Sequence, residues 1–375
     1  MRKLFAVLLV LVMLLPACAF AAADDDDDDL LIEEVIDSFI DDSDSEGSET
    51  LASDGSQVIT ISATGDFTIG GDSRKKTDIF DEELKRQGGD INFTMRNIRD
   101  LFINDDLTIV NFEGTLTDNT YIPDSKKDNQ FLFSAPPSYV TMLTNNGVNA
   151  VALENNHIMD HGEDAYEETK RVLKDAGITY STSTEMGVVE VKGIQIAMLS
   201  YLCIDRYDKL WEKVPADIAA AKAVYPLVIV SFHWGNEKDY SPTANQIKMG
   251  RLAVDAGADL VLGHHSHRIN PIEEYKGKYI CYSLGNFCFA GNSKPSDMNS
   301  FVFQTRFKVK NGQATPMGFR IVPIRISSRA DRNDFTPTIV TKETNIDAII
   351  NTLKDNGKKL EYAVKDYPTE WDTTQ

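Results

Sequence analysis

The chain has 375 residues, of which 42% are hydrophobic and 26% are charged, so it can bury a substantial core. Its formal net charge is −20 at pH 7, and no basic stripe is present that could neutralise a phosphate backbone, which excludes nucleic acids as partners. A small anionic substrate remains compatible with this charge, because a bound dication would dominate the field around it.

The N-terminus predicts an export signal. Arg2 and Lys3 precede an apolar run at residues 4–15, which is too short to span a bilayer comfortably, and small residues follow it. We therefore expect a signal peptide at residues 1–23 and a secreted or cell-surface protein. An uncleaved membrane anchor and a lipid anchor at Cys18 are the alternatives, and both also place the remaining chain outside the cytoplasm.

Residues 24–57 have the composition of a linker. They contain fifteen Asp and Glu residues and no Lys or Arg, beginning with six consecutive aspartates. Such a segment buries too little apolar surface to fold and stays solvated. We expect an acidic disordered spacer.

After residue 57 the sequence alternates between strand and helix signals. We predict strands at residues 58–63, 107–112, 148–153, 194–202, 227–232, 260–262 and 279–284, and helices at 90–102, 136–146, 164–176 and 242–256. Strand-like runs follow at 301–309 and 319–326, and an amphipathic helix at 345–353. The alternation predicts an α/β fold whose helices cover a sheet, with one domain at 58–330 and a C-terminal extension at 331–375.

Three cysteines follow the predicted leader. Cys203, Cys281 and Cys288 all lie in or beside apolar strand-like runs, and their spacing matches no zinc-binding pattern. We expect them to be buried thiols that act as small hydrophobic residues.

Polar clusters follow five of the predicted strands. They contain Asp66, Glu113, Asn156 with His157, His233, and His265 with His267. Ligands of open α/β sheets bind at the carboxyl ends of the strands, so these clusters should converge on one crevice. All six histidines of the chain lie in or beside the clusters: His157, His161, His233, His264, His265 and His267.

The clusters offer neutral imidazoles, carboxylates and an amide oxygen, which are ligands for a borderline metal such as Mn, Fe or Zn. Taken alone, Asp66 could cap a helix and Glu113 could pair with a surface lysine. Residues 264–267 are harder to explain without a metal, because three imidazoles in four residues would repel one another when protonated. We predict one or two divalent ions, held by Asp66, Glu113, Asn156, His233, His265 and His267.

The order of these motifs resembles that of the dinuclear metallophosphoesterases, over residues 58–290. Asp66 resembles their first aspartate, Glu113 the metal-bridging aspartate, and residues 265–267 the closing pair of histidines. Two positions depart from the pattern: Thr68 stands where that family has a histidine, and the bridging residue is a glutamate.

A closer resemblance is to the bacterial capsule-synthesis CapA family, the poly-γ-glutamate biosynthesis proteins. It is carried by residues 65–66, 111–114, 133–136, 155–162, 233–237, 263–267 and 282–287. Glu154 and Ser266 depart from it, since the family usually has a small residue and a proline there. The resemblance implies a layered metallophosphoesterase-like fold with sheets flanked by helices. It also implies that the protein acts on an extracellular anionic polymer. A membrane synthase complex is a further candidate partner.

The chemistry that follows is attack by a metal-activated water on a phosphorus or carbonyl centre. We assign His157 as the general acid, supported by Asp160, with His264 as an orienting member of the catalytic set. Glu237 is expected to orient the ligands, and Asn286 to present donors to an anionic substrate. Three functions stay open: a phosphoester hydrolase, a γ-glutamyl amide hydrolase or transferase, and a non-catalytic polymer-binding or export factor.

Overall fold

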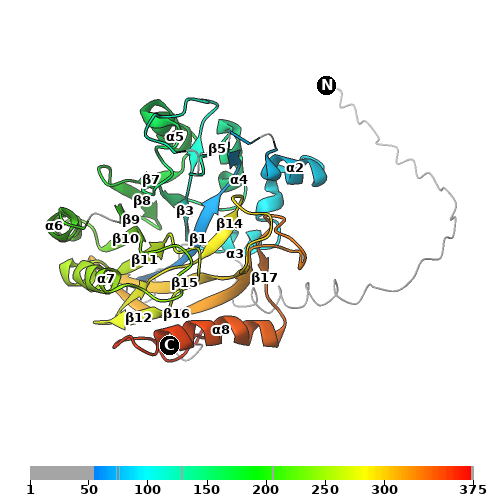
Figure 1. The fold of residues 1–375 in the computed structure, drawn as a ribbon. Coiled ribbons are helices and arrows are strands. Elements are labelled where there is room, and N and C mark those ends of the chain that lie inside the picture. Colours follow the sequence, from blue (N-terminus) through cyan, green and yellow to red (C-terminus); the bar gives the residue numbers. More distant parts are fainter. Residues whose placement is uncertain (1–54, 73, 76, 128–129, 205–206, 373–375) are drawn as a thin grey trace, which may run out of the picture. The chain divides into compact units, whose positions relative to one another are not determined.

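A computed structural model describes residues 55–372, apart from 73, 76, 128–129 and 205–206 (Figure 1). The described residues all belong to one compact unit. The predicted signal peptide and nearly all of the predicted acidic spacer lie outside the described residues. Within the described part of the chain, no helix is long and apolar enough to cross a membrane.

The first sheet has eight strands, ordered β17-β16-β15-β1-β3-β6-β7, with β14 also paired to β1. Its strands are β1 (Gln57–Thr68), β3 (Leu107–Phe112), β6 (Ala150–Ala152), β7 (Thr179–Ser181), β14 (Asn286–Phe289), β15 (Asn299–Lys310), β16 (Gln313–Arg325) and β17 (Thr338–Ile339). Strands β1, β3, β6, β7 and β14 run parallel, whereas β15, β16 and β17 join antiparallel. Parallel strands place their carboxyl ends at one edge, which is where the polar clusters lie.

The second sheet has six strands in the order β12-β13-β11-β10-β9-β8. They are β8 (Gly187–Val191), β9 (Ile194–Cys203), β10 (Leu227–Trp234), β11 (Leu260–His264), β12 (Ile272–Tyr275) and β13 (Lys278–Cys281). Strands β9, β10, β11 and β13 are parallel. A small third sheet consists of β2 (Gly71–Asp72), β4 (Thr115–Leu116) and β5 (Phe133–Ala135).

The two large sheets pack face to face and share one hydrophobic core. Ile59 and Ile109 from the first sheet lie in the same buried cluster as Met198, Ile229 and Leu262 from the second. Side chains alternate along a strand, so the next residues face outward against helices. Those helices are α2 (Ile79–Arg86), α3 (Arg99–Ile103), α4 (Thr141–Thr144) and α5 (Gly162–Asp175) on the first sheet, and α6 (Leu210–Lys222) and α7 (Ala244–Ala256) on the second (Figure 1). The expected layered α/β fold, with sheets flanked by helices, is confirmed.

Two of the predicted helices are wrong in length. Residues 90–102 form a 3-10 turn, η1 (Ile91–Thr94), and the five-residue α3. The Asp90 side chain accepts a hydrogen bond from Asn92 N and caps the start of the turn. Between the turn and α3, Asn97 Nδ2 donates a hydrogen bond of 2.9 Å to Thr338 Oγ1. Residues 136–146 likewise divide into η2 (Pro137–Val140) and the short α4.

The three cysteines are as expected: Cys203, Cys281 and Cys288 are buried and free. Burial raises the pKa of all three thiols, so they stay protonated at neutral pH. No disulfide or thiolate chemistry is therefore assigned to them.

The C-terminal residues join the shared core. The last helix, α8 (Glu343–Gly357), buries Ile349 and Leu353 in the cluster between the sheets. The segment after it crosses both sheets: Val364 N donates to Ile272 O on β12 at 3.0 Å, and Ile321 N on β16 donates to Pro368 O at 2.8 Å. We call residues 358–372 the C-terminal strap, because they connect the edges of the two sheets.

Replacing Leu353 should destabilise the whole domain. Its side chain is fully buried, so Leu353→Ala removes packing from the shared core and should lower the free energy of unfolding by about 2–5 kcal/mol. Denaturant unfolding followed by circular dichroism measures this. The exposed Asn351→Ala on the same helix is the control and should change stability by less than about 0.5 kcal/mol. Equal stability of both variants would show that α8 is not part of the core.

Candidate metal centre

The site lies where the parallel strands of both sheets end. Asp66 belongs to β1 and is paired in register with Asn111 of β3, and Glu113 follows β3. His233 belongs to β10 and is paired with His264 at the end of β11. The chain therefore brings carboxylates from the first sheet against imidazoles from the second, as the strand-end rule predicts.

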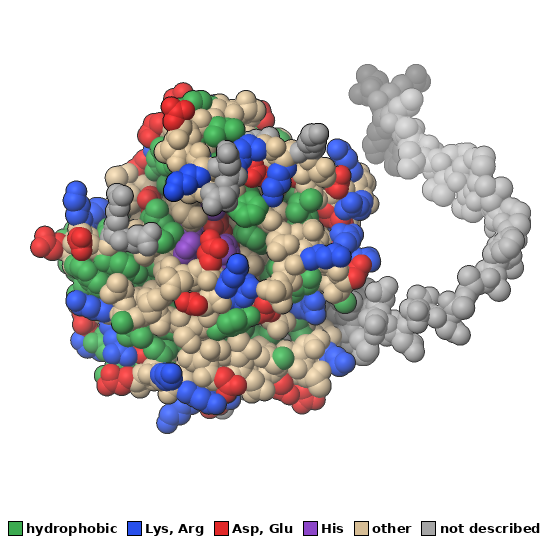
Figure 2. Space-filling model, viewed as in Figure 1, with side chains coloured by type: hydrophobic (Ala, Val, Ile, Leu, Met, Phe, Trp, Pro, Cys, Tyr) green, Lys and Arg blue, Asp and Glu red, His purple; other side chains and the backbone are tan. Residues whose placement is uncertain are grey.

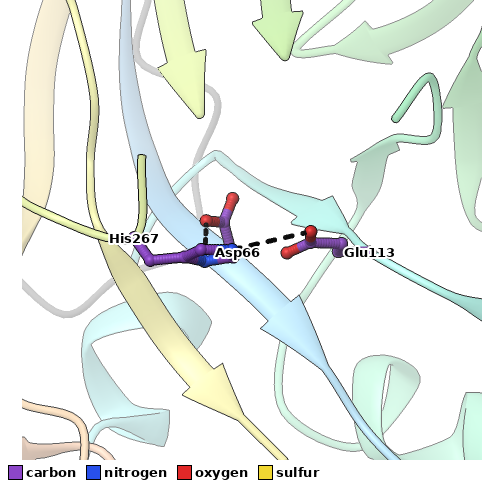
Figure 3. Close-up of side chains that lie close together, drawn as sticks. All are labelled: Asp66, Glu113 and His267. Carbon is purple, nitrogen blue, oxygen red and sulfur yellow. Dashed lines mark ion pairs between the residues drawn. The ribbon is translucent and has the colours of Figure 1, made fainter. Parts of the chain in front are cut away.

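One group of ligand atoms consists of Asp66, Glu113 and His267, whose side chains point toward one another (Figure 3). His267 Nδ1 lies 3.0 Å from Asp66 Oδ2, and its Nε2 lies 4.0 Å from Glu113 Oε1. Ligands bonded to one ion at about 2.1 Å are themselves about 3–4 Å apart. The spacing of this group therefore fits one divalent ion.

A second set of imidazoles, which we call the second ligand group, lies near the same oxygen of Glu113. His233 Nε2 lies 3.0 Å from His265 Nδ1 and 3.7 Å from Glu113 Oε1. Glu113 Oε1 and Asn156 Oδ1 are buried and have no hydrogen-bond partner among the described residues. A buried polar atom without a partner is costly, and a cation bound at either oxygen would satisfy it. Glu113 Oε1 thus lies within 4.0 Å of an imidazole from each set, but among the described residues only Asp66, Glu113 and His267 have ligand atoms that all lie within 4.8 Å of one another.

The backbone at two of these histidines is strained. His265 has φ +90° and His267 has φ +53°, in the left-handed region that side chains rarely adopt. Such conformations persist where the surrounding structure requires them, and they collect at functional sites. Here they turn both imidazoles toward the carboxylates after β11.

Burial and neighbouring charges separate the pKa values of the site. Burial lowers the pKa of His264 and of His265 to about 4, so both are neutral at pH 7 and can bind a cation. Burial, with Asp66 beside it, raises the pKa of Glu113 to about 7. Burial opposes protonation of His267, but Glu113 and Asp66 outweigh it and raise its pKa to about 9. A proton on His267 therefore occupies the place of a cation at neutral pH.

Metal affinity should fall as the pH is lowered from 9 to 6. The ion must displace the proton of His267, whose pKa is about 9, and below pH 7 also that of Glu113, whose pKa is about 7. Each displaced proton weakens apparent binding by about tenfold per pH unit below the pKa of its group. Calorimetry in buffers of different ionisation enthalpy should find about one proton released per ion near pH 8. An affinity that is constant between pH 7 and 9 would exclude His267 as a ligand.

His157 and Asp160 form the pair that the sequence predicts. His157 Nδ1 lies 2.7 Å from Asp160 Oδ2, and His157 Nε2 is 3.8 Å from Glu113 Oε1. Asp160 is fully buried and also accepts from Phe133 N at 2.7 Å and from Lys126 Nζ. The carboxylate therefore fixes the ring with Nε2 facing the ligand groups. Lys126, which reaches Asp160 from the loop before β5, was not predicted as a site residue.

The remaining candidates differ in their surroundings. His264 is buried behind Asp66, with Nδ1 3.8 Å from Asp66 Oδ1, and neither ring nitrogen has a hydrogen-bond partner among the described residues. Glu237 is exposed, and its charge raises the pKa of His265 and of His267 against the effect of burial. Asn286 Oδ1 lies 2.9 Å from His267 Nδ1, so this residue contacts a ligand candidate.

His161 is the one histidine of the described chain outside this arrangement. Its Nδ1 lies 2.9 Å from Tyr121 O, so it holds the loop before β5. It is fully buried, which makes it a useful comparison for the site histidines.

An exposed apolar rim lies near His157, whose ring is 4.6 Å from the ring of Phe133, on which Phe131 stacks. Four apolar side chains of this rim are exposed: Tyr121 (57%), Ile122 (39%), Phe131 (46%) and Met159 (39%). The first three lie on the loop before β5, and Met159 directly precedes Asp160. Lys75 Nζ lies 4.4 Å from the centre of the Phe131 ring. Figure 2 shows histidine side chains at the bottom of a hollow on this face, with basic side chains above it in the view.

Comparison with known proteins agrees with the residue pattern. A family model described as "Bacterial capsule synthesis protein PGA_cap" matches residues 60–291. The PGA biosynthesis protein CapA of Bacillus subtilis (strain 168) is 30% identical over 309 residues, covering 76% of this chain and 75% of that protein. The capsule biosynthesis protein CapA of Bacillus anthracis is 26% identical over 337 residues, covering 83% and 76%.

Two further matches cover a smaller share of the chain or have a lower identity. A probable polyglutamine synthesis accessory protein of Mycobacterium tuberculosis (strain ATCC 25618 / H37Rv) is 28% identical over 211 residues, covering 48% of this chain and 55% of that protein. The crystal structure of the calcineurin-like phosphoesterase YfkN from Bacillus subtilis matches with 16% identity and a TM-score of 0.41, covering 81% of this chain and 100% of that chain.

Proposed function

The chain belongs to the bacterial capsule synthesis protein family, and from this premise we propose that it is a metal-dependent hydrolase that works on an anionic polymer outside the cytoplasm. Poly-γ-glutamate is the polymer that the relatives indicate. The predicted signal peptide at residues 1–23, or a lipid anchor at Cys18, would bring it to the cell surface, within reach of a membrane synthase complex.

The observation that carries the proposal is the position of Glu113. Its Oε1 is buried, has no hydrogen-bond partner among the described residues, and faces the imidazoles of both ligand groups at 3.7–4.0 Å. A carboxylate in this position, beside a second buried carboxylate, is costly without a cation. The residues therefore fit one or two divalent ions of the Mn, Fe or Zn type.

In the proposed hydrolysis, some site residues hold the ions and one donates a proton. Asp66, Glu113 and His267 would hold an ion on one side, and Asn156, His233 and His265 would join Glu113 on the other. A bound ion supplies a water of lowered pKa and polarises the electrophilic centre. His157 Nε2 faces the same space and would give its proton to the leaving atom, while Asp160 Oδ2 holds Nδ1 at 2.7 Å.

A non-catalytic polymer-holding role is the second candidate. The exposed rim of Tyr121, Ile122, Phe131 and Met159, with Lys75 over Phe131, would hold the methylene groups and carboxylates of a polymer without cleaving it. The Asp160–His157 pair favours the enzyme, because binding alone does not need an oriented acid.

A substrate panel tests the proposal. Purified residues 56–375, loaded with Mn²⁺, Fe²⁺ or Zn²⁺, would be incubated with phosphomonoesters, phosphodiesters and poly-γ-glutamate. Release of phosphate, or of new amino groups with shortening of the polymer, distinguishes the phosphoester from the γ-glutamyl reaction. Binding of poly-γ-glutamate with no turnover of any substrate would overturn the hydrolase in favour of the polymer-holding role.

A further inference from the structure

We propose that Asn111 is a positioning residue that holds Asp66 and His233 as metal ligands across the two sheets. The inference rests on the proposed metal centre and assigns a role to a residue that is itself neither a ligand nor an acid. Asn111 lies near the end of β3 and is fully buried. Its backbone is paired in register with Asp66 on β1.

The amide nitrogen contacts one ligand candidate from each sheet. Asn111 Nδ2 lies 2.8 Å from Asp66 Oδ1 and 3.3 Å from His233 Nδ1. An amide nitrogen carries two hydrogens, so it can donate to a carboxylate and still face a second group. The tautomer of His233 decides whether the longer contact is a hydrogen bond, but in either form the amide fills the space beside Nδ1.

These contacts determine which atoms remain for the ion. With Oδ1 of Asp66 bound to Asn111, Oδ2 faces His267 Nδ1 at 3.0 Å. With Nδ1 of His233 against the amide, Nε2 faces His265 Nδ1 at 3.0 Å and Glu113 Oε1 at 3.7 Å. One side chain therefore orients a member of each ligand group before any ion is present.

An amide suits this position better than an acid or an apolar residue. Asp66 and Glu113 already place two buried carboxylates here, and the charge of Asp66 helps to raise the pKa of Glu113. A third carboxylate would add repulsion, and an aliphatic side chain would leave Asp66 without its donor. Asn111 Oδ1 itself is buried with no hydrogen-bond partner among the described residues, so the position is not optimised for stability.

Asn146 is a matched control. It is also fully buried, its Nδ2 donates to Met142 O at 2.8 Å, and its Oδ1 likewise has no hydrogen-bond partner among the described residues. It lies after α4 and takes part in neither ligand group. Asn111→Ala therefore removes a buried amide inside the metal centre, and Asn146→Ala removes an equivalent buried amide outside it.

The test is metal binding by full-length protein, with Zn²⁺ affinity measured against a chelator and Co²⁺ coordination by its absorption spectrum. We expect Asn111→Ala to weaken Zn²⁺ binding by about 10–100-fold and to change the Co²⁺ bands. Asn146→Ala should leave both unchanged. Asn111→Leu, which keeps the branched shape but has no donor, should reproduce the loss and serves if the alanine variant fails to fold.

The outcomes separate this inference from the proposed function. Wild-type binding by both Asn111 variants overturns the positioning role but leaves the metal centre intact. Equal losses in the Asn111 and Asn146 variants also overturn it, because the effect would then be one of general packing. If wild-type protein binds neither Zn²⁺ nor Co²⁺, the metal centre fails and the positioning role fails with it.

Discussion

The double substitution His265→Ala/His267→Ala should remove most of the metal that the purified protein carries. The two histidines belong to different ligand groups: His267 Nδ1 lies 3.0 Å from Asp66 Oδ2, and His265 Nδ1 lies 3.0 Å from His233 Nε2. Losing one imidazole from each group leaves too few ligands for either ion. Elemental analysis after dialysis should find wild type with one or two ions per chain and the double variant with almost none.

His161→Ala is the control for this experiment. His161 is also a fully buried histidine, but its Nδ1 contacts Tyr121 O and it belongs to neither ligand group. It should lose stability without losing metal. The single variants then show whether the two groups bind separate ions, because each should remove its own. Equal metal content in the double variant and wild type would refute the assignment of the site.

Replacing His157 should stop turnover without removing the metal. His157 is oriented by Asp160, and its Nε2 points toward Glu113 from 3.8 Å, close to the ligand groups. A general acid contributes about 10²–10⁴ in rate, so His157→Asn should lower kcat by about that factor. Steady-state kinetics on whichever substrate the panel identifies measures this, with metal content and melting temperature determined on the same preparations.

Three other results would change the assignment of His157. Loss of metal would make it a ligand, and Asp160 or His264 would then be tested as the acid. Unchanged turnover would make it neither ligand nor acid. Absence of turnover in wild type, together with binding of polyglutamate, would support the non-catalytic role instead.

The sequence predicted the strands of the site well, and the reason is physical. Strand β3 occupies residues 107–112, the range that its apolar run predicts, because a parallel strand buried on both faces reads as a continuous hydrophobic segment. Strands β9 and β10 differ from their predicted ranges only at their carboxyl ends, by one and two residues. Since polar residues lie at or just after the carboxyl ends of such strands, their meeting at one edge could also be predicted.

Other features depend on contacts that no local pattern records. Helix α6 was missed because Pro215 lies inside it. Asn286 was predicted to contact a substrate or to orient a ligand, and its Oδ1 lies 2.9 Å from His267 Nδ1, a contact that the sequence does not reveal. Lys126 and Asn111 act only through partners from distant strands and loops, so their part in the site required the three-dimensional structure.

Strand β1 pairs with β15, a strand far along the chain, so the metal site can be completed only late in synthesis. Strand β1 carries Asp66 and comes first in the described chain, yet Gln57 pairs with Val309 of β15, and the strap that joins the sheets ends at residue 372. Contacts between such distant residues form late, because the intervening chain must exist before it can close. A chain translocated N-terminus first would emerge with its ion-binding pocket incomplete. If the chain is exported as we propose, ion binding would therefore follow translocation and the pairing of these distant strands.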